Sequence, residues 1–152
     1  MTSAVPDLER LRERLIGMKI GGGPVVVPPH EGVIGHRALG YVAAHEPTLH
    51  PVWATLLTLR GMEISFDRLF ELAEGSAEDG IYFGEAAVDI REDLEVGTTY
   101  SVAGEITDLV RRHGKTAGTF DVLSFRLDLR AADGDIAATA SNSFIFVRKD
   151  GA

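Results

Sequence analysis

The feature that most constrains the fold is a change of period after Gly80. Downstream of it, four long segments are rich in β-branched and aromatic residues, at 82–92, 98–110, 119–131 and 135–148. In the third segment Leu123, Phe125, Leu127 and Leu129 alternate with Ser124, Arg126, Asp128 and Arg130. This alternation predicts a strand with one buried face and one wet face. Short turns such as Asp133-Gly134 separate the segments, so we predict an antiparallel meander of consecutive strands.

Upstream of Gly80 the apolar residues recur at helical spacing. We predict helices over 6–16, 33–44, 51–60 and 65–72, and a short strand or extended arm over 25–27. The 51–60 helix is apolar nearly all round, which indicates a buried helix. Helices followed by a run of strands predict an α+β fold. No repeat or linker divides the chain, so we expect a single domain over 1–152, in which 1–23 forms an N-terminal helix and a glycine-rich arm.

Composition excludes several classes of function. A net charge of −8 disfavours nucleic acid as a partner, because such a chain gains little from displacing counterions on phosphates. The absence of cysteine excludes disulfides and thiolate chemistry. The five histidines form no i, i+4 pair on a predicted helix, and Gly21-Gly22-Gly23 lacks the Lys-Ser/Thr of a phosphate-binding loop. We therefore predict no metal and no nucleotide cofactor. The charged N-terminus and the lack of a long apolar run predict a cytoplasmic protein with no membrane contact.

Three runs carry a resemblance to a known family. They are HPVWATLLTLRGM (50–62), FGEAAVDIREDLEVGTTYSVAGEI (83–106) and GTFDVLSFRLDLRAADGDIAATASNSFIF (118–146). These runs resemble the MaoC-like dehydratases, or (R)-specific enoyl-thioester hydratases, and in particular their N-terminal-type domains. The resemblance implies a hot-dog fold, in which a curved antiparallel sheet wraps around a central helix. It also implies acyl-CoA or acyl-carrier-protein thioesters as ligands, water added to or removed from the α,β bond, and no cofactor.

Active members of that family carry an Asp followed by Asn-Pro-x-His before the central helix. A carboxylate and an imidazole at that place hold one water and move its protons. The following helix N-terminus, or a nearby backbone amide, polarises the thioester oxygen. Here the stretch reads His45-Glu46-Pro47-Thr48-Leu49-His50, so the Asp is absent and the proline is one position out of register. This N-terminal-type domain therefore has a degenerate catalytic motif.

On these grounds His50 and Glu46 are the candidate catalytic residues, and His45, Trp53 and Asn142 are candidate substrate-binding residues. Four of these residues have a structural alternative. His50 would be a loop histidine bonded to backbone, Glu46 a solvated loop carboxylate, His45 a structural residue or a partner of His50, and Asn142 a satisfied interior amide. Glycines within the strand segments, Gly84 and Gly104, predict bulges or close backbone approach.

Three functions follow from the resemblance. The first is a hydratase or dehydratase subunit, a lyase of fatty acid or polyketide metabolism. The second is a non-catalytic partner that completes the acyl tunnel of a catalytic subunit, which the missing Asp favours. The third, a thioester hydrolase, requires a carboxylate on the central helix; 51–60 has none, and Glu63 lies past Gly61.

The open edges of a single hot-dog sheet predict a homodimer, or a heterodimer with another hot-dog subunit. Docking of an acidic acyl-carrier protein would require a local basic patch. The sequence offers one cluster for it, Arg111, Arg112 and Lys115.

Overall fold

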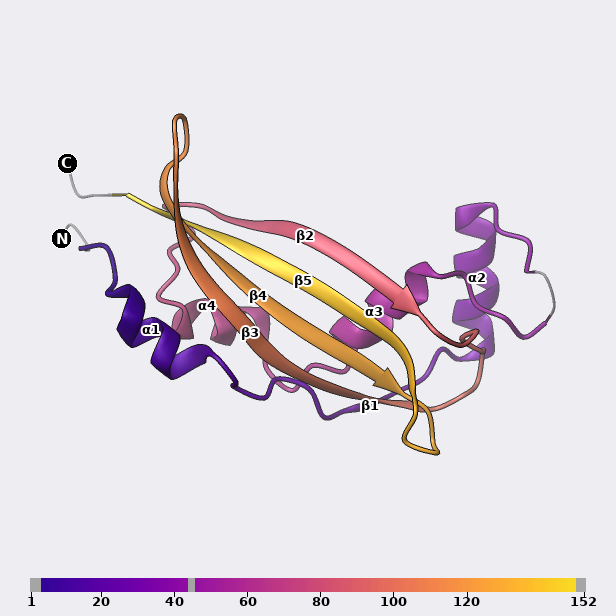
Figure 1. Ribbon diagram of the computed structural model, residues 1–152. Coiled ribbons are helices and arrows are strands. Elements are labelled where there is room, and N and C mark those ends of the chain that lie inside the picture. The colour runs from indigo at the N-terminus through magenta and orange to yellow at the C-terminus, as the bar shows by residue number, and fades with distance from the viewer. Residues whose placement is uncertain (1–3, 44–45, 150–152) are drawn as a thin grey trace.

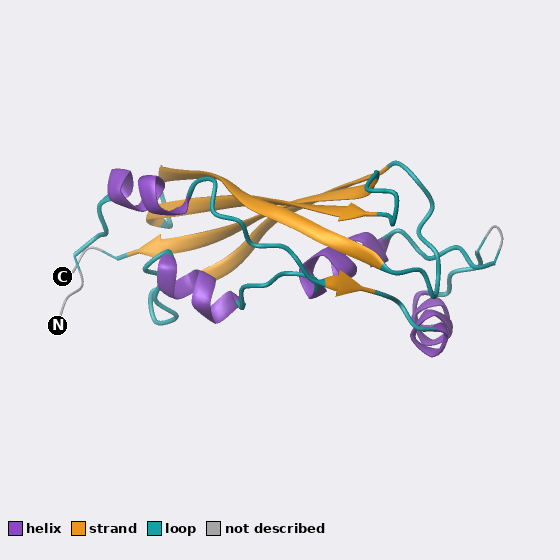
Figure 2. Cartoon of the chain, turned by 90° about the horizontal axis from the view of Figure 1, so that it is seen from below, coloured by secondary structure: helices purple, strands orange, loops and turns teal. Residues whose placement is uncertain are grey.

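The computed structural model describes residues 4–43 and 46–149. Its elements follow in the order α1 (Leu8–Leu15), β1 (Pro24–Val25), α2 (Pro29–Leu39), α3 (Val52–Arg60), α4 (Phe66–Leu72), β2 (Ile81–Ile90), β3 (Tyr100–Gly114), β4 (Gly118–Arg130) and β5 (Ile136–Arg148). The five strands form one antiparallel sheet in the order β1-β3-β4-β5-β2 (Figure 1). Helix α3 contacts β2, β4 and β5 on the inner face of this sheet, and Figure 2 shows α3 and α4 together on that side. This is the predicted α+β hot-dog arrangement, which is confirmed.

The meander prediction is correct for β3, β4 and β5 but wrong for β2. Strand β2 pairs with β5, from Ile81 opposite Phe146 to Ile90 opposite Ala138. The physical reason lies in the connection over 91–99, which is too long for a tight hairpin. Within it Leu94 is buried, and its carbonyl accepts from the N–H of Leu49 at 2.7 Å. The connection is therefore used to anchor the segment before α3, and β2 is left as an edge strand.

The predicted helices are present, with one correction. Helix α2 begins four residues before its predicted start, at Pro29, and ends at Leu39 rather than at residue 44. Gly40, with a φ of 62°, adopts the left-handed conformation that ends a helix. Helix α3 buries Trp53, Ala54, Leu57 and Thr58 as expected. One side of α3 nevertheless faces solvent, because Leu56 is exposed.

Both strand glycines have the architectural roles predicted for them. Gly84 lies in a bulge of β2 between Phe83 and Ala86. A Cβ on Gly104 would lie 2.4 Å from Leu127 Cδ2 and 2.9 Å from the carbonyl oxygen of Arg126. No side chain fits at this position, which lies where the N-terminal arm crosses β3 and Ile20 N donates to Gly104 O at 3.0 Å.

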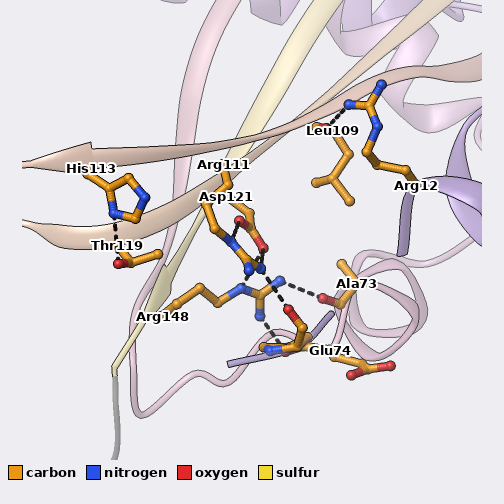
Figure 3. Close-up of polar contacts among 10 residues, drawn as sticks. Arg12, Ala73, Glu74, Leu109, Arg111, His113, Thr119, Asp121 and Arg148 are labelled. Atoms are coloured by element: carbon orange, nitrogen blue, oxygen red, sulfur yellow. Dashed lines mark hydrogen bonds and ion pairs between the residues drawn. The ribbon is translucent and has the colours of Figure 1, made fainter. Parts of the chain in front are cut away.

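A buried ion-pair network holds α4 beneath the sheet (Figure 3). Asp121 is fully buried and accepts from Arg111 Nε at 2.7 Å and from Arg148 Nε at 2.8 Å. The Arg148 guanidinium also donates to the carbonyls of Ala73 and Glu74, which follow α4. One carboxylate thus connects three strands, and one arginine of the network reaches the end of a helix.

Candidate functional site

The segment that precedes α3 is anchored to the connection between β2 and β3. Besides the bond between Leu49 and Leu94, Val96 N donates to Pro47 O at 3.0 Å, and Thr48 forms a bridge with Glu95. Glu95 N in turn donates to the Tyr100 hydroxyl at 3.0 Å. These contacts fix His50 at the Tyr100 end of β3, at the start of α3.

His50 is half-buried and serves as a cap of α3. Its Nδ1 accepts from the backbone N–H of Val52 at 3.0 Å, and its ring meets Tyr41 edge-on, with centroids 4.8 Å apart. Because Nδ1 accepts, the neutral imidazole carries its proton on Nε2. The alternative interpretation of His50, as a loop histidine bonded to backbone, describes this geometry.

The first N–H groups of α3 are all used within the chain. Val52 N donates to His50, while Trp53 N and Ala54 N donate to the carbonyls of His50 and Pro51, each at 3.0 Å. Pro51 has no N–H. The polarising helix N-terminus that the resemblance implied is therefore engaged, because the tight turn before α3 satisfies its donors locally.

Glu46 is exposed and lines a cavity of about 410 Å³ together with Gly32, His36, Tyr41 and Thr48. No carboxylate among the residues that the structure describes lies within hydrogen-bond distance of His50. Glu46 and His50 are therefore not brought together as an acid–base pair. His45 lies outside the described residues, so its predicted role stays a prediction.

Two aromatic residues near His50 were not found from the sequence. The ring of Tyr41 lies edge-on between His50 and His36, at 5.1 Å from the latter. His36 belongs to α2, and its Nε2 is buried without a partner among the described residues. The spacing of 36, 41 and 50 has no regular period, so no sequence signal marks this group.

Trp53 lies in the core between α2 and α3. It is 6% exposed, and a Cβ on Gly35 would lie 3.0 Å from its Cζ2. Its Nε1 has no partner within the described part of the chain. These contacts are those of a packing residue, and a substrate-binding role for Trp53 stays a prediction.

Asn142 lies on the inner face of β5, opposite Phe125 of β4 and Ala86 of β2. The side chain is 4% exposed. Neither its Oδ1 nor its Nδ2 has a hydrogen-bond partner within residues 4–43 and 46–149. The protein atoms of the described residues therefore do not satisfy this amide, and a substrate-binding role for Asn142 stays a prediction.

The predicted basic cluster is neither intact nor near His50. Arg111 is turned inward, where it pairs with Asp121 and donates to the carbonyl of Pro6 at 2.9 Å. The cluster lies at the hairpin between β3 and β4, at the opposite end of the sheet from α2 (Figure 1). An acyl carrier docked there would not face the segment before α3.

Among the described residues, no three His, Asp or Glu side chains gather as metal ligands. No helix in this part of the chain has the length and apolar character needed to cross a bilayer.

Comparison with known proteins places the fold. No protein-family model matches the chain, and no curated protein matches it in sequence. Among solved structures, the ChsH1-ChsH2 complex from Mycobacterium tuberculosis matches with a TM-score of 0.69 and 12% identity, over 95% of this chain and 91% of that chain. The truncated HadBC (3R-hydroxyacyl-ACP dehydratase) complex from the same organism matches with a TM-score of 0.67 and 13% identity, over 86% of this chain and 96% of that chain.

A protein described as a MaoC-like dehydratase matches at 0.68 with 16% identity, over 92% of this chain and 44% of that chain. A putative thioesterase is also similar, at a TM-score of 0.55. At such low identities the likeness concerns the fold and leaves the reaction open. The chain therefore has the hot-dog fold that MaoC-like dehydratases and hydroxyacyl dehydratase complexes share.

Proposed function

We propose that this chain is an accessory hot-dog subunit of an acyl-thioester hydratase or dehydratase, whose acid–base pair comes from a second hot-dog subunit. One observation carries this proposal. At the start of α3, His50 Nδ1 and the N–H groups of Val52, Trp53 and Ala54 are all engaged with one another or with local carbonyls.

Hydration of an enoyl thioester needs two parts at one place, an acid–base pair and a set of hydrogen-bond donors. A carboxylate and an imidazole must share a water, and free donors must meet the thioester oxygen as it gains negative charge. In this chain the motif Asp is absent, and the helix donors nearest to His50 are used for capping. Both parts would then come from a partner, while this chain contributes the wall of the acyl site.

Strand β2 is the surface on which such a partner would pair. It is an edge of the sheet, and its residues 82–89 are exposed. Large apolar side chains on it, Tyr82, Phe83 and Val88, are 60%, 46% and 40% exposed. An open strand edge with exposed apolar side chains favours pairing with another chain. The two-chain complexes named above support such an assembly as a proposal for this chain.

A second candidate function is catalysis by His50 itself. The observation that favours it is that Nδ1 alone is engaged in a hydrogen bond, which leaves Nε2 for proton transfer. A carboxylate of a partner would assist it, because Glu46 forms no hydrogen bond or ion pair with His50. A hydrolase role ranks last, because α3 carries no carboxylate and a Cβ on Gly22 would lie 2.3 Å from Glu63 Oε1, which places Glu63 under the glycine-rich arm.

Hydration of crotonyl-CoA and of longer enoyl-CoAs, measured on the purified chain and on the chain with its co-purified partner, tests the proposal. We expect no hydration by the chain alone and hydration by the complex. The variant His50→Asn, which keeps an acceptor for Val52 N, should leave the rate of the complex unchanged. If His50 is the catalytic group, the chain is active and His50→Asn lowers its rate by about 10²–10⁴-fold.

Binding of acyl thioesters by this chain, whether the carrier is CoA or an acyl-carrier protein, is part of this proposal. The cytoplasmic location and a place in fatty acid or polyketide metabolism also stay predictions from the sequence.

A further inference from the structure

Asn142 is an isolated polar side chain in an apolar surface. Along β5 its inner-face neighbours are Ala140 and Phe144, both buried. Across the sheet it pairs with Phe125 and Ala86. Its carboxamide offers two donors and an acceptor, and none of the three finds a partner among the residues that the structure describes.

Such a group is costly to keep in a folded chain. The penalty for burying an unpartnered amide exceeds the net gain from an ordinary hydrogen bond. An apolar side chain would continue the pattern of the inner face without that penalty. The position therefore calls for a polar group that reaches Asn142 from outside this chain.

An apolar strip on the same face leads from Asn142 to the edge of the sheet. Pairing places Phe83 beside Phe144, Ala86 beside Asn142, and Val88 beside Ala140, so these β2 residues share the inner face with Asn142. All three are exposed. The strip consists of Phe83, Ala86 and Val88, and β2 also contacts α3. Asn142 thus lies one strand inward from the surface where the proposed partner subunit pairs.

We propose that Asn142 selects acyl chains that carry a hydroxyl group, by a hydrogen bond from the carboxamide to that hydroxyl. A hydroxyl both donates and accepts, so it satisfies Oδ1 and Nδ2 together. A carbonyl would satisfy only Nδ2, and a carbon–carbon double bond would satisfy neither. The apolar surroundings suit an acyl chain, so the complementary ligand is a 3-hydroxyacyl thioester. This inference rests on the proposed binding of acyl thioesters, and it holds whether or not His50 is catalytic.

The amide groups in the pantetheine arm of CoA also offer a donor and an acceptor, so they could pair with Asn142 in place of the hydroxyl. Three probes separate the two sources. 3-Hydroxybutyryl-CoA carries the arm and the hydroxyl, butyryl-CoA carries the arm and an unsubstituted chain, and free CoA carries the arm alone. Their affinities are measured by titration calorimetry on the full chain together with the partner with which it co-purifies.

We expect the wild-type complex to bind 3-hydroxybutyryl-CoA about tenfold more tightly than butyryl-CoA, as one well-placed hydrogen bond allows. Asn142→Leu should remove this preference and keep the affinity for butyryl-CoA. The matched control is Ser141→Ala, because Ser141 is exposed on the opposite face of β5 and its loss should leave the preference intact.

Melting temperature reports whether Asn142→Leu folds, and we expect it to melt at or above the wild type because the buried amide is gone. If it does not fold, Asn142→Ser supplies the test, and a reduced preference for the hydroxylated chain is the expected result. A preference that survives in these variants would overturn the role of Asn142. So would equal binding of the two acyl-CoAs by the wild type, or an equal loss for all three probes, which would indicate an arm amide. If the wild type binds neither acyl-CoA, the proposed function fails as well.

Discussion

The backbone N–H of Val52 donates to Nδ1 of His50 across 3.0 Å, so the histidine at the start of the central helix is a cap. The same turn engages the N–H groups of Trp53 and Ala54. The helix N–H groups that would polarise a thioester oxygen, and one of the two imidazole nitrogens, are therefore used to begin α3.

Replacing His50 should show how much its cap contributes to stability. We expect His50→Ala to lower the free energy of unfolding by about 1 kcal/mol, because Val52 N loses its acceptor. His50→Asn should recover most of this loss, since an asparagine oxygen accepts in the same turn. Urea denaturation followed by circular dichroism measures both. Equal stability of His50→Ala and the wild type would mean that the cap contributes nothing.

Assembly through β2 predicts that a charge on its inner face blocks the interface. Light scattering on the wild type at micromolar concentration should give a mass above the 16.4 kDa of one chain, and Val88→Lys should return it to that mass. The control is Val33→Lys on α2, a position that is 51% exposed and should leave the assembly unchanged. A wild type that scatters as a single chain, or a Val33→Lys variant that dissociates, would contradict pairing through β2.

The ion-pair network around Asp121 should be sensitive to the loss of one partner. Arg148→Met removes the donor to Asp121 and to the carbonyls of Ala73 and Glu74, and leaves part of a buried carboxylate uncompensated. We expect it to lower the free energy of unfolding by about 3 kcal/mol. Lys149→Met, one residue further on at an exposed position, should cost no more than about 0.5 kcal/mol. Similar losses in the two variants would argue against a special role for the network.

Tyr100 predicts a fall in stability at alkaline pH. Burial is the main cause that raises the pKa of its hydroxyl in the folded chain. The folded state therefore disfavours the phenolate, so its stability is fully present below the unfolded pKa of about 10 and is lost as pH rises from there through the raised folded pKa. Denaturation between neutral pH and pH ~11 should show a steeper fall for the wild type than for Tyr100→Phe. Tyr82→Phe is the control, because its ring is 60% exposed, and it should keep the wild-type slope.

The sequence by itself determined the kinds of element and much of their extent. Alternation from Leu123 to Leu129 predicts β4 and its buried face, and the apolar run after Pro51 predicts α3. Such patterns are local consequences of burial, because side chains on one face recur at the period of the element. The resemblance then supplied the hot-dog arrangement, and it identified the segment before α3 as the place to look for a site.

Only the tertiary structure decided which groups are engaged. The pairing of β2 with β5, the inward turn of Arg111 toward Asp121, and the absence of a partner for Asn142 within the described chain all depend on residues distant in sequence. Even the segment that carries the short-range bond between His50 and Val52 is held by contacts with Leu94 and Val96, which are distant in sequence. A hydrogen bond needs a donor and an acceptor at a specific distance and angle. Residue type and spacing do not determine that geometry, because it is set by where the folded chain places both atoms.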